Sequence, residues 1–184
     1  MRYTGAEVLA VADAFTDAVL DVFGGPPWEH RDRAAILERL RRDVHRPGFT
    51  AILSFSDSGA VDGFATGWIT GAPFRTDRAY GRVTARLGPE RVADLLVGAL
   101  EVDELGVRER VRGTGLGRRL LAELTTEAPD GHAWLLTSRH AHDAVAFYRR
   151  AGWWEPEAVP GMDNDVLVFL SPTHTGRFDS AAGR

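Results

Sequence analysis

The chain has 184 residues, 44% of them hydrophobic, which is enough to bury the core of one domain. Its 26 acidic and 22 basic residues are scattered and give a formal net charge of −4, which argues against nucleic acid as a partner. Because it has no cysteine, disulfides, thiolate metal sites and a cysteine nucleophile are excluded. No segment has the pattern of a signal peptide or a membrane span, so we expect a cytoplasmic protein with no membrane association.

The first part of the chain predicts two helices and then a hairpin. Apolar residues at three- and four-residue steps predict a helix over 6–22, which a Gly-Gly-Pro-Pro run ends. A second amphipathic helix is expected over 31–44. The period then changes, and an Asp-Ser-Gly turn between 49–55 and 61–70 predicts two antiparallel strands.

The second part predicts alternating strands and helices. Residues 71–90 hold chain breakers and little periodicity, so we expect a long loop with room for one short helix. Residues 91–97 fit either a helix or a strand. The remaining elements are strands over 99–107, 133–137, 153–154 and 166–170, and helices over 116–124 and 143–150. This order predicts a single mixed α/β domain.

A glycine-rich turn joins the strand that ends at Val107 to the next helix. The segment from Arg112 to Gly117 carries three glycines, which leave backbone N–H groups uncovered at a helix N-terminus, a site that attracts phosphate. Arg112 and Arg118 bracket the turn and offer directional donors. A dinucleotide fingerprint is excluded because Arg118 stands three residues after Gly115, and a phosphate loop is excluded because Gly-Lys-Ser/Thr is missing. A tight connection without a ligand is the alternative.

Two motifs in this part of the chain resemble a known family. The segments from Leu105 to Val107 and from Arg112 to Leu121 resemble the signature of the GNAT superfamily of N-acetyltransferases, which is Arg or Gln, any two residues, Gly, any residue, then Gly or Ala. The segment from Ala144 to Trp153 looks like the family's second motif, A-x-x-[FL]-Y-x-[KR]-x-G-[FW]. The resemblance is good over residues 99–155.

The resemblance implies a fold and a domain layout. We expect a single GNAT domain over residues 1–172, with a mixed, mostly antiparallel central sheet flanked by helices and a splayed parallel strand pair. Residues 173–184 are then a loosely ordered tail, because they are rich in Thr, Ser, Gly and Ala.

The resemblance also implies acetyl-CoA as the acyl donor, with its pyrophosphate on the glycine turn and its pantetheine arm between the splayed strands. The residues implied in its binding are Leu105, Val107, Arg112, Gly113, Thr114, Gly115, Leu116, Gly117 and Arg118. The backbone of Leu105 and Val107 would bind the pantetheine amides. The chain departs from the family at Ala141, where an Asn often bonds the cofactor; either His140 or His142 replaces it, or the contact is missing.

Three side chains are candidates for the proton transfers. The resemblance assigns Tyr148 as the acid that protonates the leaving thiolate, and an ordinary pKa near 10 would keep it protonated at neutral pH; a core tyrosine is the alternative. Glu101 and Asp103 are the candidate bases, since strand alternation places both on one face. The side chain of Glu104 would point to the opposite face unless the strand carries a bulge. The base could also act through water, and either carboxylate could be only solvated or salt-bridged.

The predicted function is therefore direct transfer of an acetyl group from acetyl-CoA to the primary amine of a small-molecule acceptor. A noncatalytic acyl-CoA-binding module is the alternative. A metal site is not expected, because the His140-x-His142 pair lacks a third ligand at a suitable spacing. Family members are often dimers, so a homodimer is one option. An apolar, acidic acceptor pocket could draw on Trp28, Glu29, Phe74, Asp77, Trp154 and Glu157.

Overall fold

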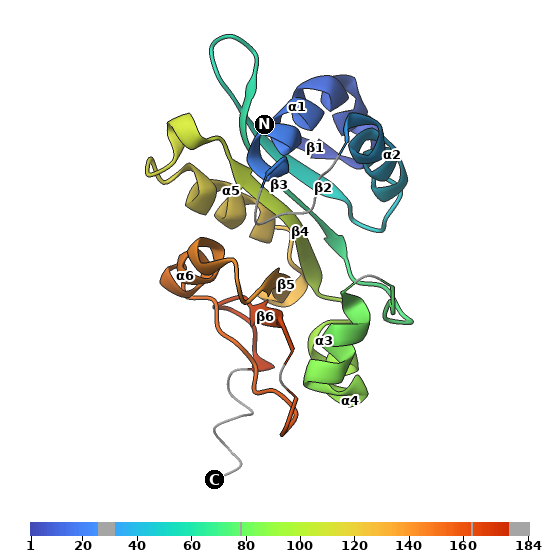
Figure 1. Cartoon of the computed structure of the whole chain (residues 1–184). Helices are drawn as coiled ribbons and strands as arrows, with labels where there is room; N and C mark the ends of the chain where they lie inside the picture. Colours follow the sequence, from blue (N-terminus) through green and yellow to red (C-terminus); the bar gives the residue numbers. More distant parts are fainter. Residues whose placement is uncertain (26–31, 78, 163, 177–184) are drawn as a thin grey trace. The chain divides into compact units, whose positions relative to one another are not determined.

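The computed structural model describes residues 1–25, 32–77, 79–162 and 164–176 (Figure 1). A six-stranded sheet runs in the order β1-β2-β3-β4-β5-β6. The strands are β1 (Arg2–Thr4), β2 (Thr50–Phe55), β3 (Val61–Ile69), β4 (Leu100–Val107), β5 (Ala133–Ser138) and β6 (Val166–Leu170). The α-helices are α1 (Ala12–Phe23), α2 (Arg33–Asp43), α3 (Tyr80–Leu87), α4 (Pro89–Leu95), α5 (Leu116–Thr125) and α6 (His142–Arg150). Short 3-10 helices cover Gly5–Val11, Glu109–Val111 and Pro129–Gly131.

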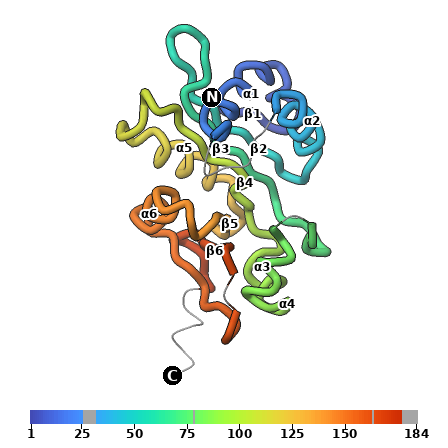
Figure 2. The backbone as a smooth tube through the Cα atoms, in the orientation of Figure 1, coloured from blue at the N-terminus to red at the C-terminus, as the bar shows by residue number. Residues whose placement is uncertain are grey.

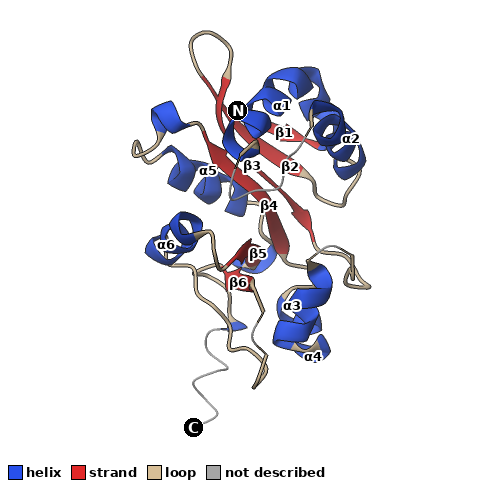
Figure 3. Cartoon of the chain, in the orientation of Figure 1, coloured by secondary structure: helices blue, strands red, loops and turns tan. Residues whose placement is uncertain are grey.

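The strand pairing is mixed, as predicted. β2 pairs antiparallel with both β1 and β3, and β5 pairs antiparallel with β6. β4 and β5 are parallel, with Leu100 opposite Ala133 and Glu101 opposite Trp134. This parallel pair within a mixed sheet flanked by helices (Figure 3) confirms the predicted fold class.

The chain forms two compact units. The first consists of Met1–Trp68 and Val102–Thr126, and the second of Ile69–Glu101 and Glu127–Arg184. The boundary within β4 falls between Glu101 and Val102, so the two ends of this strand belong to different units. Each unit has a hydrophobic cluster of its own.

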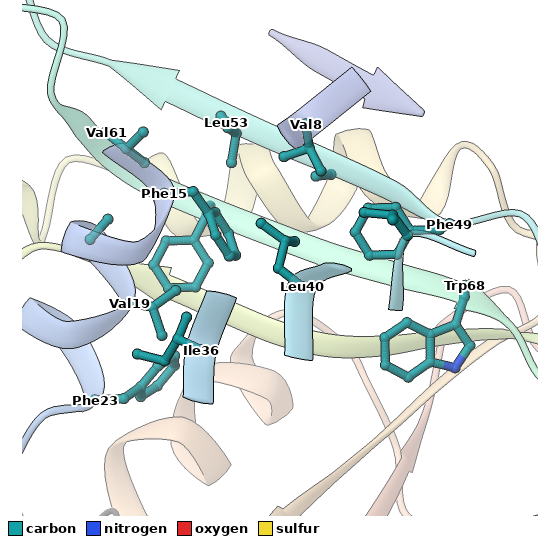
Figure 4. Close-up of a cluster of buried hydrophobic side chains, with 14 residues drawn as sticks. Val8, Phe15, Val19, Phe23, Ile36, Leu40, Phe49, Leu53, Val61 and Trp68 are labelled. Atoms are coloured by element: carbon teal, nitrogen blue, oxygen red, sulfur yellow. The ribbon is translucent and has the colours of Figure 1, made fainter. Parts of the chain in front are cut away.

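In the first unit, α1 and α2 cover one face of the strands and α5 covers the other. Figure 4 shows the cluster on the α1 and α2 side, where Phe15 and Phe23 meet the ring of Phe64 edge-on at centroid distances of 5.3 and 5.9 Å. The preceding residue, Gly63, faces α5, and a Cβ there would lie 2.9 Å from a Leu120 methyl group. Because side chains alternate along β3, this glycine lets α5 pack directly against the strand.

In the second unit, alternate residues of β6 face different helices. Val166, Val168 and Leu170 belong to the cluster that also contains buried residues of α3 and α4. Phe169 points the other way and lies 5.8 Å, centroid to centroid, from the ring of Tyr148 in α6. The period of two in the strand therefore positions α6 and its tyrosine.

Several details differ from the sequence-based expectations. Within 71–90, α3 is the short helix for which the prediction left room, while the start of α4 at Pro89 was not predicted; α4 also shows that 91–97 is largely helical. β1 was not predicted. Of the strand expected at 153–154, only an isolated bridge from Trp154 to Leu170 is present. Residue 31, the expected start of the second helix, lies outside the described residues.

The last described residues are bonded to the second unit. The Thr173 hydroxyl donates to the Gly131 carbonyl at 2.6 Å. His174 is 1% exposed; its Nδ1 accepts from the Gly176 N–H at 3.2 Å, so its Nε2 donates to the Leu95 carbonyl at 2.9 Å. Residues 177–184 of the expected tail lie outside the described part of the chain. Among the helices described, none is long and apolar enough to cross a membrane.

Candidate active site

The glycine turn lies between β4 and α5 in the first unit (Figure 2). Gly113 and Gly115 have φ angles of 78° and 81°, and a Cβ at either position would have no heavy atom within 4 Å. Only glycine adopts this backbone without strain, and the space beside the turn is open. Arg119 is the first residue of α5 whose N–H reaches back into the turn, to the Gly115 carbonyl at 3.1 Å. The N–H groups that precede it in α5 therefore have no intrahelical partner and are available to a ligand.

The arginines around the turn fall into two groups. Arg108 and Arg110 are bound to Asp21 and Asp62 of the same unit. The side chains of Arg112, Arg118 and Arg119 are exposed beside the glycines. The turn therefore combines a helix N-terminus with exposed guanidinium groups, which suits a pyrophosphate.

Glu101, the first candidate base, is buried at the start of β4. It is 4% exposed, and its Oε1 accepts a hydrogen bond from the hydroxyl of Tyr80 in α3, which is also 4% exposed. Both residues belong to the second unit. A buried carboxylate that accepts a hydrogen bond from a fixed donor is suited to proton transfer.

Asp103, the second candidate base, has different surroundings. Both of its carboxylate oxygens accept from Nη2 of Arg39 at 2.6 Å, and Glu104 accepts from Nη1 of the same guanidinium at 2.9 Å. Arg39 also donates to Asp43 at 3.2 Å. Burial alone would lower the pKa of Arg39, but the three carboxylates raise it above its ordinary value. Strand alternation was expected to place Asp103 and Glu104 on opposite faces. That expectation is wrong, because these consecutive residues bind one guanidinium.

Tyr148 has a buried ring and an available hydroxyl. The residue is 9% exposed, and its ring packs against Phe147, Trp153 and Phe169. Within the described part of the chain, its hydroxyl has no hydrogen-bond partner. Thr16 Oγ1 is the one fully buried side-chain polar atom there that lacks a partner, so the Tyr148 hydroxyl is not fully buried. Burial raises the pKa of the Tyr148 phenol above its ordinary value, so it remains protonated at neutral pH.

The position that departs from the family pattern starts α6. Ala141 is the N-cap residue, 7% exposed, and its N–H donates to the Ser138 carbonyl at 3.0 Å. The two residues considered as replacements, His140 and His142, flank it with exposed side chains. No group of three or more His, Cys, Asp or Glu side chains in the described ranges is arranged to hold a metal ion.

The residues considered for the acceptor pocket do not form one described group. Trp28 and Glu29 lie outside the described residues. Phe74 packs on Tyr80 at a ring distance of 5.6 Å, and Asp77 is bonded to Arg75. Trp154 donates to the Ser171 carbonyl at 3.1 Å. Phe74 is therefore in ring contact with Tyr80, which donates a hydrogen bond to Glu101.

Sequence reasoning missed Tyr80 and Arg39. The steps from Tyr80 to Val83 and Leu87 have helical spacing, so an amphipathic helix could have been predicted there. Nothing in the sequence indicates that its first residue meets Glu101, because this contact joins positions 21 residues apart. The contacts of Arg39 with β4 are likewise not visible in any local pattern.

Comparisons with known proteins identify the family of the chain. The model of the acetyltransferase (GNAT) family matches residues 13–153. That range contains the glycine turn, both candidate carboxylates and Tyr148. A search of curated protein sequences found no match.

Solved structures share the fold at low sequence identity. Naa20 of Chaetomium thermophilum, in complex with a bisubstrate analogue, superposes with a TM-score of 0.60 at 17% identity over 94% of this chain and 85% of its own. A structure from Corynebacterium glutamicum, described as histone acetyltransferase HPA2 and related acetyltransferase, gives 0.60 at 18% identity over 89% and 92%. An acetyltransferase from Thermus thermophilus gives 0.57 at 18% identity over 92% and 93%.

Proposed function

Because the chain belongs to the GNAT family of acetyltransferases, we propose that it transfers an acetyl group from acetyl-CoA directly to the primary amine of a small-molecule acceptor. The observation that carries the proposal is the Gly113 to Gly117 turn, whose open glycines and helix N-terminus fit a pyrophosphate. Family membership supports acyl transfer in general, whereas the amine acceptor is our proposal.

The turn and the strand before it bind the donor in this proposal. The backbone N–H groups from Gly113 to Arg118 bind the phosphates, and the exposed guanidinium groups of Arg112 and Arg118 add charge-assisted hydrogen bonds. The backbone of Leu105 and Val107 in β4 binds the pantetheine arm. Acetyl-CoA supplies the activated acetyl group and a thiolate leaving group. These contacts orient the donor, which lowers the entropic part of the barrier.

Two side chains move protons in this proposal. Glu101 accepts a proton from the acceptor ammonium, so that the neutral nitrogen forms a bond to the acetyl carbon while the carbon–sulfur bond breaks. Tyr148 donates its phenolic proton to the departing sulfur, and the second proton that the nitrogen loses as the amide forms returns to the Tyr148 phenolate. We favour Glu101 over Asp103 as the base because the Asp103 carboxylate is held in an ion pair by Arg39.

A noncatalytic acyl-CoA-binding module is the competing function. It needs the glycine turn but neither Glu101 nor the Tyr148 hydroxyl. The unbonded hydroxyl at the end of a buried ring favours the enzyme, because a tyrosine that only fills the core would be replaceable by Phe at no cost.

Calorimetry with acetyl-CoA, followed by a screen of amines for release of free CoA, tests the proposal. We expect acetyl-CoA to bind. We also expect at least one small amine to cause release of free CoA at a rate proportional to the enzyme concentration. Peptides with free N-termini belong in the same screen, so that a protein acceptor is detected. Binding without turnover on any amine would support the module, and no binding of any acyl-CoA would contradict both functions.

A further inference from the structure

We propose that Tyr80 is a positioning residue for the base Glu101, holding its carboxylate ionised and in a fixed orientation. The inference rests on the proposed function, because it takes Glu101 as the base. It concerns a residue of α3, a helix that carries neither of the two family motifs.

The hydrogen bond between the two side chains has a defined chemical effect. An ionised carboxylate only accepts, so the Tyr80 hydroxyl donates to Oε1 of Glu101. Both residues are 4% exposed, and burial at this level disfavours a charged carboxylate. A charge-assisted hydrogen bond counters that penalty and favours the ionised form, which is the form that a general base needs.

The Tyr80 ring is held on several sides, so the hydroxyl has a fixed position. Phe74 and Trp134 lie at ring distances of 5.6 and 6.4 Å, both near edge-on. The Arg75 guanidinium lies over the ring, 4.6 Å from its centroid. Val83, one turn along α3, is fully buried and keeps the helix in place. The donor is therefore preorganised rather than recruited by the substrate.

The charged groups described near Glu101 include those of the segment before α3. Arg75 and its partner Asp77 precede α3, and the Arg75 charge interacts with Glu101. On β5, the residue opposite Glu101 is Trp134, which does not titrate. Along β4, Asp103 is paired with Arg39. The Tyr80 hydroxyl thus donates directly to Glu101 in a setting where Arg75 adds a favourable positive charge.

The substitution Tyr80→Phe tests the inference because it keeps the ring contacts and removes the hydroxyl. We expect the acid limb of the kcat/KM profile to move up by about one pH unit, since a hydrogen bond to a charged group has that order of effect on a pKa. Activity should return toward the wild-type value at high pH, while the KM for acetyl-CoA stays unchanged. The control Tyr3→Phe removes a weakly bonded hydroxyl in β1 and should leave the profile in place.

Two further measurements keep the result interpretable. In a Glu101→Gln background, Tyr80→Phe should lower kcat no further, because both changes act through one carboxylate. Carbon NMR of the Glu101 carboxyl group, assigned with Glu101→Gln, should show a higher pKa in Tyr80→Phe without any assay of activity. An unchanged Glu101 pKa by NMR, or an unchanged pH profile of kcat/KM in an active enzyme, would overturn this inference and leave the proposed function standing. A folded wild type that turns over no amine would overturn the proposed function as well.

Discussion

Single residues of β4 have sharply different surroundings despite their closeness in sequence. Glu101 accepts from a neutral tyrosine hydroxyl, whereas Asp103 is bound to a guanidinium that also serves Glu104 and Asp43. Strand alternation predicted one shared face and gave no basis for choosing between Glu101 and Asp103. We propose Glu101 as the base because the Asp103 carboxylate is held by the Arg39 guanidinium, and a carboxylate in such an ion pair is a weaker base.

The two carboxylates should respond differently to amidation. We expect Glu101→Gln to lower kcat by about 100-fold or more, the usual contribution of a general base. Asp103→Asn should reduce kcat only several-fold and lower the free energy of unfolding by about 1–3 kcal/mol, since it weakens a hydrogen-bonded ion pair. Steady-state kinetics and urea unfolding of both variants measure these effects. The opposite order of kcat values would identify Asp103 as the base, and small losses in both would indicate proton removal through water.

At the level of elements, the turn between β4 and α5 is where local sequence was most informative. Gly113 and Gly115 have positive φ angles and open space, as expected for a phosphate-binding turn. The glycine pattern is local, and so are the helix and strand periods on either side, which is why this part of the fold could be predicted.

The turn offers a matched pair of substitutions. Gly113→Ala adds a methyl group and about 1–2 kcal/mol of backbone strain, which should weaken acetyl-CoA binding about tenfold or more. Gly59→Ala imposes similar strain in the β2–β3 hairpin, where φ is 80° and space is also open, and it should leave binding unchanged. Calorimetry measures both. Equal affinities for the two variants would show that the turn does not hold the phosphates.

The elements that sequence reasoning missed depend on contacts between distant segments. β1 is three residues long and is defined by pairing with β2, about fifty positions away. Tyr80 and Arg39 reach β4 from segments whose own patterns say nothing about that strand. Local periodicity predicted that 31–44 forms a helix, and α2 confirms this for Arg33–Asp43, but it could not predict which residue the helix would present to β4.

At the scale of the whole molecule, the candidate residues are divided between two compact units. The glycine turn and Asp103 belong to the first unit, whereas Tyr80, Glu101 and Tyr148 belong to the second. The second unit also contains His174, whose neutral ring is bonded at both nitrogens. Burial lowers the pKa of this histidine, and the nearby His132 lowers it further, while the bond to Leu95 opposes them.

This histidine should make the protein less stable in mild acid. As the pH falls below about 6.5, the unfolded chain binds a proton at His174 before the folded chain does, so the free energy of unfolding falls with pH. Between pH 7 and pH 5, we expect the free energy of unfolding of His174→Gln to fall less steeply with pH than that of the wild type. The difference in slope should correspond to at most one bound proton. Urea unfolding at several pH values measures the slope, with His45→Gln, an exposed site, as the control. Equal slopes in His174→Gln and wild type would contradict the assignment.

We propose that the protein transfers an acetyl group to an amine with Tyr148 as the acid. The most direct test compares wild type and Tyr148→Phe for CoA release with the best amine from the screen, with mass spectrometry of the acetylated product. We predict one acetylated amine per CoA in the wild type, and a kcat about 100-fold lower in Tyr148→Phe with an unchanged KM for acetyl-CoA. An undiminished kcat in Tyr148→Phe, or CoA release without an acetylated amine, would contradict the account.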